Sequence, residues 1–159
     1  MTSVGVVHTA FGAAALACGL AIVVRPKGTR WHRALGWAYV ASMVGLFVTS
    51  FLIYRLFGRF GPFHWAAVGG ALTLAGGLAP VLWRRPRGTW VERHYYLMSY
   101  SYLGLLAATG AEIATRVPGV AFTAGAVVAS LAVIGSGAVV IRRTARGLLG
   151  ELHRRGSGA

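Results

Sequence analysis

Five apolar segments, each about 20 residues long, make up most of the chain. They cover residues 4–24, 34–54, 63–83, 95–115 and 120–141. A helix of this length crosses the hydrocarbon core of a bilayer, and it satisfies within itself the backbone hydrogen bonds that lipid cannot supply. We therefore expect an all-α integral membrane protein, a bundle of about five transmembrane helices that form a single transmembrane domain over residues 1–141.

The composition agrees with a lipid environment. Apolar residues make up 56% of the chain and charged residues only 12%, whereas soluble domains contain about 25% charged residues. The net charge of +13 comes from basic residues that follow the apolar segments, without the basic stripe that neutralises phosphates in nucleic-acid-binding proteins. The pattern therefore predicts the lipid bilayer as a partner and excludes nucleic acid.

The basic residues gather on one side of the expected membrane. Those that follow the first, third and fifth segments are Arg25, Lys27, Arg30, Arg33, Arg84, Arg85, Arg87, Arg93, Arg142, Arg143, Arg146, Arg154 and Arg155. Only Arg55, Arg59 and Arg116 fall on the other side. Because cytoplasmic loops carry the excess of Lys and Arg, we expect a multi-pass protein of the inner (cytoplasmic) membrane, with its N-terminus outside and a basic cytoplasmic tail over residues 142–159.

An internal repeat organises the first four segments. The loop sequence R-P-K-G-T at residues 25–29 is matched by R-P-R-G-T at residues 85–89. Short loops join antiparallel neighbours, and repeated helical units are common in membrane bundles. We expect two tandem helical hairpins, at about residues 4–54 and 63–115, with the fifth segment as one additional helix.

Four histidines lie at equivalent places in this repeat. His8 and His64 share the outer level of the expected bundle, and His32 and His94 share the inner level. Ionisable residues at membrane depth are costly and mark sites, although a histidine at a helix end can also bond to headgroups and water. Since two imidazoles from facing helices can hold haem b, we favour a transmembrane electron-transfer protein similar to b-type cytochromes. Each pair would ligate haem near one face, with a quinone or another redox partner.

Glu112 is the only carboxylate inside an expected segment. Arg116 follows four residues later, and this spacing allows an ion pair along one helix. Together with His8 and His64, Glu112 would alternatively form a two-histidine, one-carboxylate set that suits a divalent metal or a proton relay. The alternative hypothesis is thus a non-haem membrane protein, with either a metal or proton/solute site on these residues or, without a cofactor, the role of an accessory subunit in a larger complex.

Small residues recur inside the segments. They include Ala15 with Gly19, Gly69 with Gly70, Gly76 with Gly77, and Gly135 with Gly137. Small residues let helix backbones approach closely. They predict tight packing within one bundle, with a homodimer face as the alternative.

Motifs of soluble enzymes are absent from the sequence. There is no phosphate loop, dinucleotide fingerprint, nucleophile elbow or helical H-E-x-x-H zinc motif. Three acidic residues in all leave few groups for general acid–base chemistry. The sequence does not decide whether the protein is an enzyme.

The histidine-containing segments resemble a family of small bacterial predicted membrane proteins that is known only as a domain of unknown function. The most specific part is the K-G-x-x-x-H-R-x-L-G segment that begins at Lys27, and His8, His64 and Arg93-His94 with Met98 extend the resemblance over roughly the first 115 residues. The resemblance implies a membrane location and no particular activity. The paired histidines are also similar in layout to di-haem transmembrane b cytochromes, although five spans are fewer than those bundles commonly have.

Overall fold

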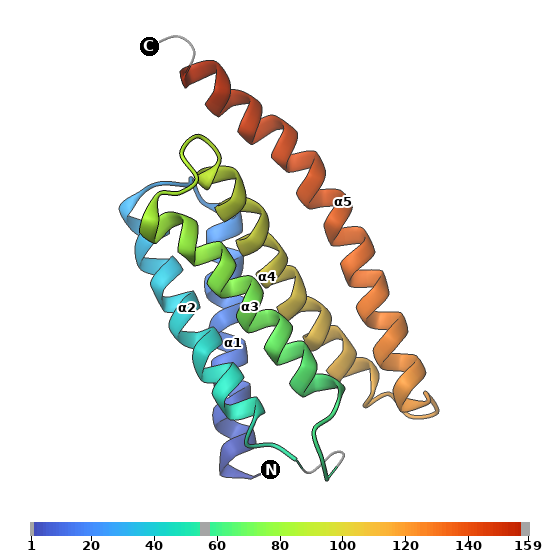
Figure 1. Cartoon of the computed structure of the whole chain (residues 1–159). Coiled ribbons are helices and arrows are strands. Elements are labelled where there is room, and N and C mark those ends of the chain that lie inside the picture. Colours follow the sequence, from blue (N-terminus) through green and yellow to red (C-terminus); the bar gives the residue numbers. More distant parts are fainter. Residues whose placement is uncertain (1, 55–57, 157–159) are drawn as a thin grey trace. The chain divides into compact units, whose positions relative to one another are not determined.

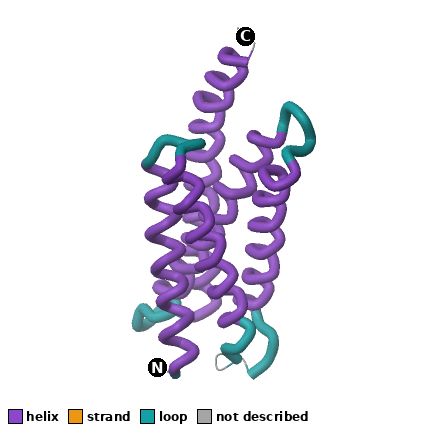
Figure 2. Tube along the Cα trace, turned by 90° about the vertical axis from the view of Figure 1, so that its left-hand side faces the viewer, coloured by secondary structure: helices purple, strands orange, loops and turns teal. Residues whose placement is uncertain are grey.

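Helices form every regular element of the part of the chain that the structure describes. This computed structural model describes residues 2–54 and 58–156, with side chains as far as residue 150 (Figures 1 and 2). The elements are α1 (Ser3–Val24), α2 (Arg30–Ser50), α3 (Pro62–Trp83), α4 (Trp90–Ala114) and α5 (Phe122–Gly156). The prediction of an all-α chain is confirmed.

Three of the helices, α1, α3 and α5, are long and apolar enough to cross a membrane. The 22 residues of α1 and of α3 correspond to about 33 Å at 1.5 Å per residue, which exceeds a hydrocarbon core of about 30 Å. The 21 residues of α2 and the 25 residues of α4 are long enough, but these helices carry more polar and basic side chains. The structure therefore supports a membrane protein with three candidate spans, where the sequence pattern predicted five.

The helices extend beyond the apolar segments. α2 begins at Arg30 because the Thr29 hydroxyl caps it, accepting a hydrogen bond of 3.1 Å from the backbone N–H of His32. α5 continues through residues 142–156, so the segment expected to be a tail is helical as far as its backbone is described. Hydropathy marks the part of a helix that lipid can cover, and it does not mark the polar turns that prolong the helix.

The two matching loops share a backbone feature. Gly28 and Gly88 occupy equivalent places and both have positive φ, 78° and 89°, a conformation that glycine adopts without a Cβ penalty. In the first loop, the Lys27 ammonium also donates to the carbonyl oxygens of Ile22 and Val23, at 2.6 and 2.8 Å. Lys27 therefore caps the C-terminus of α1, where a cation is favoured, although burial lowers the pKa of Lys27.

The first compact unit, Met1–Leu72, contains α1, α2 and the N-terminal half of α3. α1 and α2 form an antiparallel hairpin (Figure 1). Ala15 of α1 is fully buried, and Tyr39 and Met43 of α2 are 2% exposed. A Cβ on Gly45 would lie 2.6 Å from the ring of Phe11, so a larger residue at this crossing of α1 and α2 would force the Phe11 ring to shift.

The second compact unit, Thr73–Ala159, contains the C-terminal half of α3, with α4 and α5. A Cβ on Gly77 would lie 2.9 Å from the sulfur and 3.1 Å from the backbone nitrogen of Met98, and a Cβ on Gly137 would overlap Leu103. These glycines have the close-packing role that was predicted for the small residues. Gly69 and Gly135 do not, since an added Cβ there meets no atom within 4 Å.

Candidate functional site

His8 lies in the second turn of α1 and reaches across to α2. Its Nδ1 lies 2.9 Å from the hydroxyl of Thr49. That hydroxyl lies 2.7 Å from the carbonyl oxygen of Gly45, and we assign its single hydrogen to this oxygen, which can only accept. The hydroxyl therefore accepts from Nδ1–H, and the lone pair of the neutral imidazole lies on Nε2.

His94 has the same arrangement in the second unit. It lies in the first turns of α4, and its Nδ1 is 2.8 Å from the carbonyl oxygen of Gly77 in α3. Because a carbonyl oxygen can only accept, Nδ1 carries the hydrogen and Nε2 again has the lone pair. The close approach of α3 and α4 at Gly77 brings this carbonyl within reach of the imidazole.

His64 uses its ring nitrogens in the opposite way. It is 4% exposed, and its Nδ1 accepts a hydrogen bond of 3.1 Å from the backbone N–H of Gly61. Gly61 precedes Pro62, the first residue of α3, so His64 takes the third position of a capping box, where glutamate or glutamine usually reaches back to the N-cap N–H. In the neutral ring the hydrogen is therefore on Nε2, which is buried and has no hydrogen-bond partner among the residues that the structure describes.

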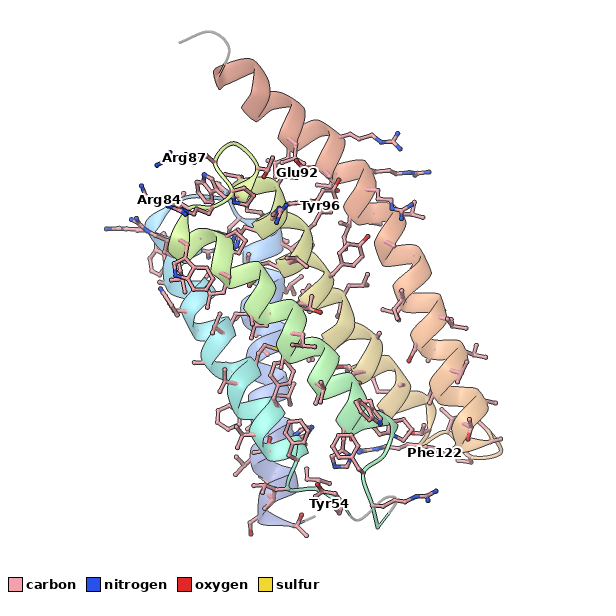
Figure 3. All side chains as sticks on the ribbon, in the orientation of Figure 1. Tyr54, Arg84, Arg87, Glu92, Tyr96 and Phe122 are labelled. Carbon is pink, nitrogen blue, oxygen red and sulfur yellow. The ribbon has the colours of Figure 1, made fainter. Side chains whose placement is uncertain are left out.

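Aromatic rings surround His64. The ring centroid of Tyr54 lies 4.7 Å from that of the imidazole, that of Phe60 lies 4.9 Å away and that of Phe51 lies 6.1 Å away. We refer to Phe51, Tyr54, Phe60 and His64 as the aromatic cluster. Tyr54 places it at the end of the first unit where α1 begins (Figure 3). Sequence reasoning selected His64 alone, because aromatic residues after an apolar segment are most often interfacial.

Both histidines of the predicted outer pair lie against the same end of α2. His8 contacts Thr49 in the last turn, and His64 contacts Phe51, the C-cap residue. The predicted inner pair is divided between the units, since His32 belongs to the first and His94 to the second. The pairing of His32 with His94 stays a prediction.

Glu112 forms an ion pair with Arg116 of the same helix. Its side chain is exposed and belongs to the second unit, whereas His8 and His64 belong to the first. Within residues 2–54 and 58–150, no group of three or more His, Cys, Asp or Glu side chains is placed to hold a metal ion. The ion pair expected from the spacing is thus found, and the three-residue metal site receives no support.

Comparisons with family models, with curated proteins and with solved structures found no match to this chain. The resemblance to the family of unknown function and the similarity in layout to di-haem cytochromes therefore stay predictions. Function has to be argued from the side chains themselves.

Proposed function

We propose that this chain is a multi-pass membrane protein that carries electrons through b-type haem, with Nε2 of His8 as a ligand near one face and Nε2 of His94 as a ligand near the other. One observation carries the proposal: each of these imidazoles donates its Nδ1–H to an acceptor on the neighbouring helix. Histidines that ligate metals almost always donate the other ring N–H in this way, which sets the tautomer and orients the ring.

The residues differ in how well they suit haem. Haem iron takes a nitrogen lone pair, which His8 and His94 have on Nε2. At His64, Nδ1 is already used by Gly61 and Nε2 carries the hydrogen, so ligation by His64 requires the capping bond to break. His32 and His94 belong to different units, and their pairing on one haem stays a prediction. When bound, haem supplies one-electron chemistry, while the chain orients the imidazoles.

The membrane arrangement in the proposal has all five helices crossing the bilayer, with the N-terminus outside. The less apolar helices α2 and α4 are compatible with this, because some of their polar side chains are buried within the protein and do not face lipid. Ser42 and Thr49 of α2 are 9% and 8% exposed, and Ser101 of α4 is 2% exposed. The distribution of arginines supports the orientation, and the inner membrane is the proposed location.

A visible spectrum tests the proposal. The full chain is produced in haem-replete cells and purified in detergent, and we expect a Soret band that sharpens on reduction with dithionite. A double variant, His8→Ala with His94→Ala, is the matched control and should lack the band. Purified wild-type protein without a Soret band, or a double variant with an undiminished one, would overturn the assignment.

A further inference from the structure

Within residues 2–54 and 58–150, the Nε2–H of His64 is a hydrogen-bond donor without an acceptor. The residue is 4% exposed, and the nitrogen itself is buried. Leaving a buried donor unsatisfied is costly, and buried polar groups in native structures nearly always have a hydrogen-bond partner. Because the capping bond to Gly61 keeps the hydrogen on Nε2, the missing partner has to be an acceptor and not a metal ion.

The neighbouring rings do not supply that acceptor. The planes of Tyr54, Phe60 and Phe51 are inclined to the imidazole plane by 29°, 31° and 35°. The Tyr54 ring stacks on the imidazole, whereas the rings of Phe60 and Phe51 are tilted to it. An N–H bond lies in the plane of its own ring, so Nε2–H does not point into the face of the stacked Tyr54 ring. The cluster thus offers inclined aromatic surfaces with one polar hydrogen at the edge.

The aromatic cluster is also reachable from outside the protein. Tyr54 and Phe60 are each 42% exposed, although they cover His64. Trp65, the next residue of α3, is 68% exposed. Its ring contacts that of Phe60 edge-on, with 5.1 Å between the ring centroids. The exposed rings of Tyr54, Phe60 and Trp65 therefore place the aromatic cluster at the protein surface, where a flat molecule dissolved in the lipid can meet it.

We propose that the aromatic cluster binds the ring of a membrane quinone, with a quinone carbonyl oxygen accepting the hydrogen bond from Nε2–H of His64. A quinone combines the required features: a carbonyl acceptor in the plane of a flat ring, and an apolar body that dissolves in the bilayer. Stacked aromatic pairs add about 0.5–1.5 kcal/mol beyond buried area. Electron exchange between the bound quinone and the protein rests on the proposed haem function. Binding of the quinone does not.

Titration with decylubiquinone tests the site on the full chain in detergent, read as quenching of tryptophan fluorescence. Trp65 contacts the aromatic cluster, so the Trp65→Phe variant shows how much of the fluorescence quenching comes from this tryptophan. We expect saturable quenching in the wild type, and a dissociation constant about tenfold higher in His64→Leu, since one hydrogen bond of about 1.4 kcal/mol is lost. His64→Gln keeps both an acceptor for Gly61 and an N–H donor, and should bind within about threefold of the wild type.

Three controls keep the outcomes distinct. Decylbenzene, which has no carbonyl, should compete poorly with the quinone. Phe60→Leu leaves His64 in place and should weaken binding by about two- to tenfold through the lost stacking, which covers the case in which His64→Leu does not fold. The double variant His8→Ala with His94→Ala should still bind quinone, so failure of the haem proposal and failure of the quinone proposal are separable.

Wild-type protein without saturable quenching would overturn the quinone proposal. So would His64→Leu and Phe60→Leu proteins that bind quinone like the wild type.

Discussion

His8 and His64 occupy the same end of the same unit and contact neighbouring parts of α2, yet their imidazoles carry the hydrogen on opposite nitrogens. His8 donates from Nδ1 to Thr49, whereas His64 accepts at Nδ1 from Gly61. A place at the same end of α2 therefore does not make two histidines equivalent. What an imidazole can do is set by the partner of its first nitrogen, because that partner decides where the lone pair remains.

The largest expected effect is a difference in haem content between variants of His8 and variants of His64. His8→Ala removes a proposed ligand, so the haem held there should be lost and the ratio of Soret to protein absorbance should fall. His64→Gln should keep that ratio, because it preserves the capping bond and removes no ligand in our assignment. If His64→Gln loses as much absorbance as His8→Ala, the two histidines act as a pair and the distinction between them is wrong.

A smaller effect is expected from the residue that orients His8. Thr49→Val keeps the shape of the side chain but removes the acceptor for Nδ1–H, and such losses typically reduce metal affinity about 10- to 100-fold. Haem titration of the apoprotein measures the affinity. Thr109→Val is the matched control, because the Thr109 hydroxyl donates to the carbonyl oxygen of Leu105 one turn earlier in its own helix. Equal affinities for the two variants would show that the contact with His8 does not matter.

A larger residue at the crossing of α3 and α4 beside His94 should lower the stability of the protein. Gly77→Ala places a methyl group against the sulfur and backbone of Met98, and overpacking of this kind costs about 1–3 kcal/mol. Thermal unfolding in detergent measures the loss, with Gly104→Ala as the control, since an added Cβ there meets no atom within 4 Å. A Gly77→Ala protein as stable as Gly104→Ala would mean that α3 and α4 do not pack this closely.

The smallest expected effect is on stability, from a substitution in the loop at residues 25–29, which is repeated at residues 85–89. Lys27→Met removes the ammonium that caps α1 and should lower the free energy of unfolding by about 0.3–1 kcal/mol, the usual value of a cation at a helix C-terminus. Lys27→Arg retains a cation and should lose less. The difference should shrink at high salt, and a difference that does not depend on salt would point to packing of the side-chain stem instead.

Much of the helical framework was readable from the sequence, and parts of it were not. The apolar segments located all five helices, because lipid-compatible residues must follow one another along a spanning helix. They placed the start of α2 at residue 34, although it begins at Arg30, since the cap at Thr29 is polar. They also ranked α2 and α4 with the other spans, whereas in the described part of the chain only α1, α3 and α5 are long and apolar enough to cross a membrane.

Within the site, His64 was the most predictable of the histidines, and its role was still missed. The G-P-x-H sequence from Gly61 to His64 is a capping-box pattern with a histidine in the third position, and a local rule of this kind needs no tertiary structure. The rings of the aromatic cluster were not predictable as a group. Phe51 and His64 belong to different elements, and the 6.1 Å between their ring centroids is set by the folded chain.

The sequence by itself determined that the chain is helical, that it belongs in a bilayer and that its histidines lie near helix ends, because these properties depend on neighbours along the chain. Only the tertiary structure decided which imidazole nitrogen carries the hydrogen. His8 owes its tautomer to Thr49, 41 residues away, and His94 owes its tautomer to a carbonyl 17 residues away. A ring proton follows the nearest acceptor in space, and packing between helices chooses that acceptor.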